Sequence, residues 1–120
     1  MDVEMILSVP ELVAQAKASV NCVSATQAFK NKQAIFIDVR EPAESNASII
    51  ENSLQIPRGV LEMNIAKYCP DPDMEIYLHC ASGGRAALAA EQLQRIGYKN
   101  VSAISCQHND VLQAKKKPVA

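Results

Sequence analysis

Residues 75–90 read EIYLHCASGGRAALAA, an apolar run that stops at Cys80 and is followed by a glycine-bearing loop and an alanine-rich segment. This order predicts a β-strand, a tight turn and the N-terminus of a helix. Cys80 is then expected where backbone N–H groups converge and where the helix dipole has its positive end. Both effects favour the thiolate, which is the nucleophilic form of cysteine.

The loop after Cys80 decides between a reactive thiol and an ordinary buried strand cysteine, which is a common alternative. It consists of small residues and one basic residue at its end, Ala81, Ser82, Gly83, Gly84 and Arg85. Small residues allow the backbone to wrap closely around the sulfur. We therefore predict that Cys80 is reactive.

Composition narrows the class of protein. The chain has 120 residues, 48% of them hydrophobic, and no internal repeat, which predicts one domain with a single core. A net charge of −1 gives no basic field for nucleic acid or an anionic membrane, and the run of lysines at 115–117 is short enough to be a solvated terminal face. Asp2 and Glu4 stand where a signal peptide would carry lysines, so a cytoplasmic protein is expected.

The four cysteines show neither a C-x-x-C pair nor zinc-ligand spacing: Cys22, Cys69, Cys80 and Cys106. In a reducing compartment they are expected to be free thiols. Cys22 is interpreted as a core cysteine and Cys69 as a loop cysteine. Cys106 and His108 are two residues apart, which is weak evidence, so neither a metal site nor a cofactor is predicted.

Strand and helix patterns alternate along the chain. Ser8 with Glu11, and Ser24 with Gln27, are spaced as capping boxes that begin helices. Strands are expected at 21–23, 34–39, 53–56, 75–80 and 100–104, and helices after Ser8, from Ser24 to about 31, from Glu41, and over 60–66 and 85–96. This alternation predicts an α/β fold with a mostly parallel sheet and helices on both faces, with residues 1–20 as a helical extension and 21–120 as the domain.

In such sheets the ligand site lies outside the carboxyl ends of the strands, where Cys80, Asp38 and Arg40 are expected. Arg85 could hold an anionic donor by paired hydrogen bonds, or it could be a surface arginine paired with a carboxylate. Because its charge opposes the helix dipole at that position, a role in the site is predicted. Asp38 and Arg40 are interpreted as structural support. His79 alternates with Cys80 and is expected in the core on the opposite face.

Three segments, AIFIDVREPAE, IPRGVLEM and IYLHCASGGRAALAAEQLQRIGYKNV, make the chain resemble a single-domain rhodanese, a sulfurtransferase, over about residues 22–104. The resemblance implies that Cys80 forms a persulfide and that Ala81 to Arg85 complete the active-site loop. It also matches Asp38, Arg40 and Glu44 to the family's D-x-R-x-x-x-E signature.

The chain departs from that family at three places. Residues 49–54 replace a His-Ile-x-Gly-Ala turn, Ser105-Cys106-Gln107 stands where Gly-Gly and then a Trp are usual, and Ala81 replaces a frequent arginine. These changes leave the fold expectation unaltered and bear on substrate preference and turnover.

The expected chemistry is sulfur transfer. The Cys80 thiolate attacks a small sulfur donor, thiosulfate or a persulfide, and the resulting persulfide passes its outer sulfur to a thiol or to cyanide, with a protein acceptor also open. A non-catalytic partner-binding module is the alternative. A cysteine phosphatase or arsenate reductase is disfavoured because four residues, not five, separate Cys80 from Arg85.

Cys106 is a candidate second thiol. By the resemblance, the strand before it lies beside the strand that ends at Cys80, so the two carboxyl ends should be neighbours. Cys106 could then resolve the Cys80 persulfide as a disulfide, although a loop cysteine that faces elsewhere is the simpler interpretation.

Overall fold

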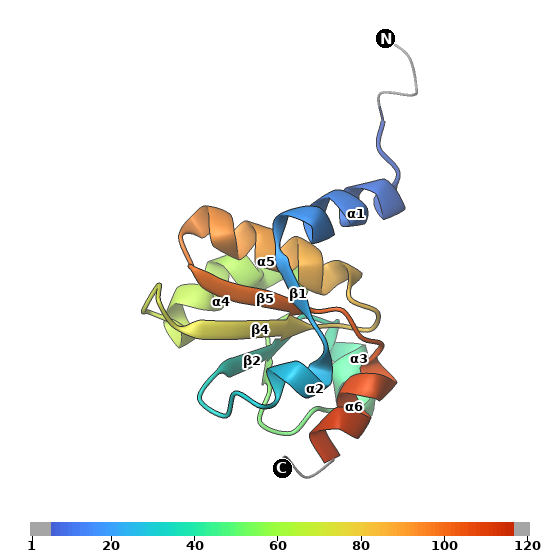
Figure 1. The fold of residues 1–120 in the computed structure, drawn as a ribbon, viewed down its shortest axis with the longest axis vertical. Helices are drawn as coiled ribbons and strands as arrows, with labels where there is room; N and C mark the ends of the chain where they lie inside the picture. The colour runs from blue at the N-terminus through green and yellow to red at the C-terminus, as the bar shows by residue number, and fades with distance from the viewer. Residues whose placement is uncertain (1–5, 117–120) are drawn as a thin grey trace.

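A computed structural model describes residues 6–116 and contains one five-stranded sheet in which every strand pair is parallel (Figure 1). The strand order is β1-β5-β4-β2-β3. The strands are β1 (Asn21–Val23), β2 (Ile35–Asp38), β3 (Leu54–Gln55), β4 (Glu75–His79) and β5 (Asn100–Ile104). Asp2, Glu4 and Lys117 lie outside the described residues.

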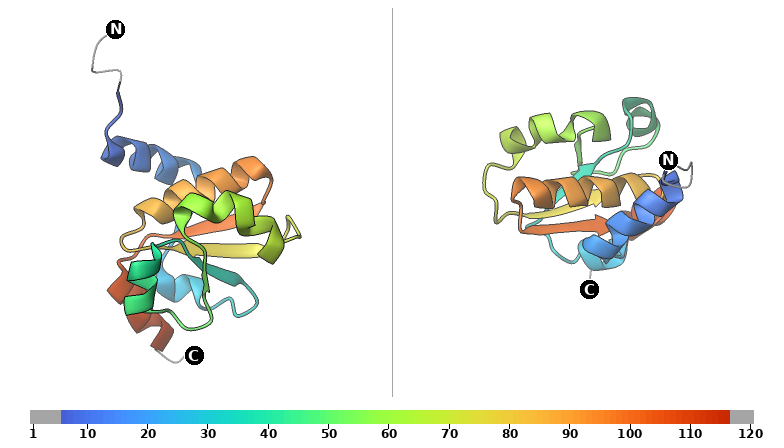
Figure 2. Two further views of the ribbon diagram at one scale, coloured as in Figure 1. Left: turned by 180° about the vertical axis from the view of Figure 1, so that it is seen from behind. Right: turned by 90° about the horizontal axis from the view of Figure 1, so that it is seen from above.

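Helices cover both faces of the sheet, as predicted (Figure 2). One face carries α1 (Val9–Ser19), α4 (Leu61–Tyr68) and α5 (Gly84–Ile96), and the other carries α2 (Ala25–Ala28) and α6 (His108–Lys116). The short helix α3 (Pro42–Ala47) and a 3₁₀ turn at Arg58–Val60 follow β2 and β3. Both therefore lie toward the carboxyl ends of the strands.

Side chains alternate between the two faces along each central strand. Ile76 and Leu78 of β4 pack under α4 and α5, whereas Tyr77 packs with Phe36 and Phe29 on the opposite face. Helix α5 meets the sheet through small residues, Ala86, Ala87, Ala89 and Ala90, all fully buried. Small side chains let this helix lie close to β4, which brings its N-terminus near the strand end.

Helix α1 packs along α5 and is part of the same core. Its N-terminus is the predicted capping box, in which the Ser8 hydroxyl accepts from the Glu11 N–H and the Glu11 carboxylate accepts from the Ser8 N–H. Ala16 and Val20 lie in the core that also contains the α4 and α5 residues. Of the second predicted capping box, one half is formed, in which the Ser24 hydroxyl accepts the Gln27 N–H. The helix that it begins, α2, ends at Ala28, earlier than the expected end near residue 31.

The later part of the chain differs in one respect from the expected elements, because a further helix follows β5. Before it, α5 ends at Ile96, which is 51% exposed beside the turn at Gly97. No helix was expected after residue 104, yet α6 follows, with Val111 buried against α2. Lys116 at its end is exposed, as expected for a solvated face, whereas Lys115 Nζ lies 5.1 Å from the centre of the Phe29 ring. No helix among residues 6–116 is both long enough and apolar enough to cross a membrane.

Candidate active site

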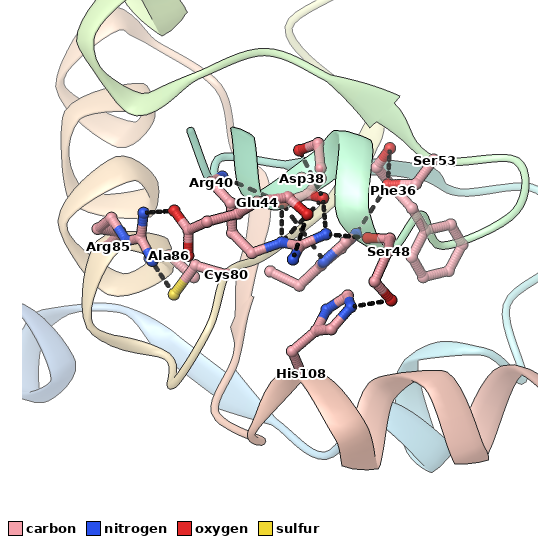
Figure 3. Close-up of polar contacts among 12 residues, drawn as sticks. Phe36, Asp38, Arg40, Glu44, Ser48, Ser53, Cys80, Arg85, Ala86 and His108 are labelled. Carbon is pink, nitrogen blue, oxygen red and sulfur yellow. Dashed lines mark hydrogen bonds and ion pairs between the residues drawn. The ribbon is translucent and has the colours of Figure 1, made fainter. Parts of the chain in front are cut away.

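Cys80 follows the last residue of β4 and is 1% exposed. Its Sγ accepts the backbone N–H of Gly83 at 3.1 Å. It also accepts the N–H of Ala86 at 3.3 Å (Figure 3). The Ala86 N–H belongs to the first turn of α5, whose N–H groups have no partner within the helix. The two donors and the positive end of the helix dipole therefore both act on the sulfur, and both stabilise a negative charge there.

The turn that aims these donors depends on Gly83. This residue has φ +95°, a left-handed conformation that side chains other than hydrogen disfavour. A Cβ at Gly83 would also lie 3.2 Å from the Ser105 Cα. On the same side, the Ala81 carbonyl accepts the His108 N–H at 2.9 Å. The loop is thus held against the segment between β5 and α6, and its geometry is set before any ligand arrives.

Arg85 makes a paired contact with a carboxylate that comes from α3. Its Nη1 lies 2.6 Å from Glu44 Oε1 and its Nη2 lies 2.9 Å from Glu44 Oε2. The hydrogen bonds from Arg85 lower the pKa of Glu44 to about 2, so the pair is charged at neutral pH. The structure shows the pairing of Arg85 with a carboxylate, one of the two roles that the sequence left open. An anionic donor would have to share the Arg85 guanidinium with Glu44 or displace Glu44 from it.

Asp38 and Arg40 form a buried ion pair. The Arg40 Nε lies 3.0 and 3.1 Å from the two Asp38 oxygens, and its Nη2 lies 2.8 Å from Oδ2. The remaining guanidinium contacts go to the backbone carbonyls of Glu44 and Ser48. Although burial raises the pKa of Asp38, the hydrogen bonds from Arg40 outweigh it and the pKa lies below its ordinary value. The pair joins β2 to α3 and so positions the backbone that carries Glu44.

His79 lies on the sheet face opposite Cys80, as the alternation of β4 predicts. It is fully buried, with Nε2 2.7 Å from Ser53 Oγ and Nδ1 4.0 Å from Asp38 Oδ1. Burial lowers the pKa of His79 to about 4, even though the nearby Asp38 acts in the opposite direction. The imidazole is therefore neutral at pH 7 and serves as a buried hydrogen-bonding group.

Cys106 and Cys80 have separate partners. The Cys106 Sγ accepts the Ala25 N–H at 3.3 Å and packs with the core under α2 and α6, whereas Cys80 belongs to the core under α1, α4 and α5. A disulfide would require both side chains to leave these positions, so the linkage stays a prediction without support from a contact. The interpretation of Cys22 as a core cysteine was wrong, because Cys22 is exposed on the edge strand β1. Cys69 lies in the loop directly after α4, as expected, and its side chain is fully buried.

Three functional contacts were missed from the sequence. The sequence matched Glu44 to the family signature but assigned it no partner, whereas in the structure its carboxylate accepts a hydrogen bond from Arg85. His108 Nε2 lies 3.0 Å from Ser48 Oγ and thereby ties α6 to the end of α3. The Ser105 backbone lies where it would crowd any side chain at position 83, and this restricts the position to glycine. Among residues 6–116, no three His, Cys, Asp or Glu side chains are grouped so that they could hold a metal ion.

A family model described as a rhodanese-like domain matches residues 23–106. The chain belongs to this family. A curated sulfurtransferase from Allochromatium vinosum is 33% identical, over 56% of this chain and 61% of that protein. The chain spans about three fifths of the length of the first curated relatives that it matches.

Solved structures agree with this assignment of the fold. The polysulfide-sulfur transferase homodimer from Wolinella succinogenes is similar with a TM-score of 0.70 and 30% identity, over 85% of this chain and 80% of that one. A protein of unknown function from Rhodopseudomonas palustris, described as a possible tyrosine phosphatase, gives a TM-score of 0.78 over 100% of this chain and 99% of that one. Its identity is 24%, so this likeness concerns the rhodanese fold alone.

The buried His79 predicts a stability loss in mild acid. An unfolded histidine titrates near its ordinary pKa of 6.5, whereas folded His79 titrates near 4, so between these values only the unfolded chain takes up the proton. The free energy of unfolding should fall by about 2 kcal/mol between pH 7 and pH 5, as followed by urea denaturation. In His79→Gln this slope should largely disappear, while His108→Asn, which changes the chain's other histidine, should keep most of it. An unchanged slope in His79→Gln would contradict the assignment.

Proposed function

We propose that the protein is a sulfurtransferase that moves a sulfane sulfur from a donor such as thiosulfate to a thiophilic acceptor through a persulfide on Cys80. The observation that carries the proposal is the pair of backbone N–H donors, from Gly83 and Ala86, on the Cys80 sulfur. Membership of the rhodanese-like family and the sulfurtransferase relatives support the same reaction class.

The first half-reaction loads the cysteine. The Cys80 thiolate attacks the outer sulfur of thiosulfate, a new S–S bond forms, and the S–S bond of thiosulfate breaks with its electron pair leaving on sulfite. The product carries one negative charge on the outer sulfur of the persulfide. The loop N–H groups and the α5 N-terminus stabilise this anion as they stabilise the starting thiolate.

The second half-reaction returns the enzyme to its starting state. An acceptor, either cyanide or a thiolate, attacks the outer sulfur, and the bond to Cys80 Sγ breaks with its electrons returning to the cysteine. The products are thiocyanate or a persulfide of the acceptor. Electrons and charge balance in both halves without an external oxidant.

The central test is the intact mass of the protein after incubation with thiosulfate and then with cyanide. We expect a gain of one sulfur atom followed by its loss. The Cys80→Ser variant should fold normally and gain no sulfur, because a serine hydroxyl is far too weak an acid to supply the anion. Sulfur uptake by the serine variant at the parent rate would show that Cys80 is not the carrier.

The contact between Glu44 and Arg85 predicts opposite effects of two substitutions. If Arg85 also binds the anionic donor, Arg85→Ala should raise the KM for thiosulfate roughly tenfold, because a charge-assisted hydrogen bond is lost. Glu44→Gln should lower the same KM, because it frees the guanidinium.

Steady-state kinetics with thiosulfate, which carries two negative charges, and with an alkyl persulfide, which carries one, measures this difference. The singly charged donor serves as the control and should respond less to either substitution. If both variants reduce the rate of transfer equally with both donors, Arg85 only fixes the loop to α3 and does not bind the charged group of the donor.

A further inference from the structure

A groove runs beside the cysteine loop, between α1 and the start of α5. Val9, Val13 and Lys17 follow one another at intervals of four residues, so they share one face of α1. This face lines a groove of about 360 Å³, and the opposite wall includes Ser82 and Leu88. Figure 1 shows α1 lying beside the N-terminal half of α5.

The groove reaches the loop itself. A Cβ built on Gly84, the first residue of α5, would lie 3.5 Å from Val13 Cγ2. Gly84 and Ser82 belong both to the loop around Cys80 and to the groove wall. A molecule seated here would therefore touch the outer side of the cysteine loop.

The charge of the groove is positive. Its lining includes two cations, Lys17 and Arg85, and no carboxylate. Arg85 is already paired with Glu44, whereas Lys17 has no ion-pair partner within residues 6–116. The groove therefore presents one unmatched positive charge beside an apolar wall, which suits an occupant with both an apolar part and a carboxylate.

The apolar surface continues beyond the groove along the N-terminal segment. Four large hydrophobic side chains are exposed there, Ile6 (77%), Leu7, Val9 (70%) and Leu12. Contiguous exposed apolar residues of this kind mark interaction sites in soluble proteins. Thiosulfate has no apolar surface to bury, so this region is longer and more apolar than the proposed small donor needs.

We propose that the α1 groove binds an apolar, acidic segment of a protein that accepts sulfur from Cys80, an inference that rests on the proposed function. The acceptor's cysteine thiolate attacks the outer sulfur of the Cys80 persulfide. The bond to Cys80 Sγ breaks, the cysteine regains its electron pair, and the partner leaves as a persulfide. A symmetric pair of copies of this chain is disfavoured as the occupant, because it brings the same cationic patch against itself.

Three synthetic peptides test the proposal on the full chain after loading with thiosulfate and removal of excess donor. The first contains one cysteine, two leucines and two glutamates; the second has lysines in place of the glutamates, and the third has serines in place of the leucines. The mass of each peptide over time gives the rate of sulfur transfer. We expect the first peptide to react roughly fivefold faster, in kcat/KM, than either of the others.

Substitutions in the groove should change this preference without changing transfer to cyanide. Lys17→Glu should reverse the preference between the glutamate and lysine peptides, and Val9→Ser should reduce the advantage of leucine over serine. Both positions are exposed, so the fold should tolerate the changes. Lys67→Glu is the matched control, since Lys67 is also an exposed lysine in the last turn of a helix, and it should have no effect.

The outcomes separate this proposal from the proposed function. Absence of the persulfide on Cys80 would overturn both. The proposal for the groove alone would be overturned if the outer sulfur is transferred normally to cyanide, but at equal rates to all three peptides in both the parent and Lys17→Glu. Sedimentation that detects a dimer of the chain abolished by Val9→Ser would also overturn it, because the occupant would then be a second copy.

Discussion

The site depends on one constraint: the backbone after β4 must turn within three residues so that its N–H groups face the Cys80 sulfur. Gly83 makes the turn possible because it adopts a positive φ and lets the loop approach the Ser105 backbone. The alanines of α5 then hold the helix close to the sheet, so that the Ala86 N–H also reaches the sulfur. Larger residues at these positions would move the N–H donors of Gly83 and Ala86 away from the Cys80 sulfur.

A chain of charged groups fixes the side of the site that lies over β2. The buried Asp38–Arg40 pair binds the α3 backbone, α3 carries Glu44, and Glu44 holds Arg85 in the first turn of α5. β2 and the helix that follows it, α3, are thereby joined to α5, which lies about 40 residues further along the chain, at the carboxyl ends of the strands. The buried pair would be costly if it were incomplete, and its guanidinium is bonded on the carboxylate side and on the backbone side, which limits that cost.

The parts of the site that were predicted from sequence are those with local signals. The run from Glu75 to Ala90 contains its own strand, turn and helix start, and Ser8 with Glu11 specifies a helix N-terminus within four residues. Contacts between distant residues left no such signal. Arg85 and Glu44 are 41 positions apart, and Cys106 and Ala25 are 81 apart, so the pattern of a single sequence cannot pair them. Helix α6 was missed because only one narrow apolar stripe, around Val111, distinguishes it from a solvated tail.

The electrostatics of the loop suit a reaction that keeps the same charge on the cysteine throughout. In the proposed cycle the thiolate and the persulfide each carry one negative charge, so donors that are fixed in place serve both states without rearrangement. Gly83 and the first turn of α5 supply this field from backbone dipoles, while the Arg85 guanidinium is largely matched by Glu44. A full positive charge left free beside the sulfur would bind sulfite, the anionic product of loading, as well as the donor. In the proposed cycle, the pairing of Arg85 with Glu44 would therefore favour release of sulfite, and selection of the acceptor would depend on surfaces outside the loop.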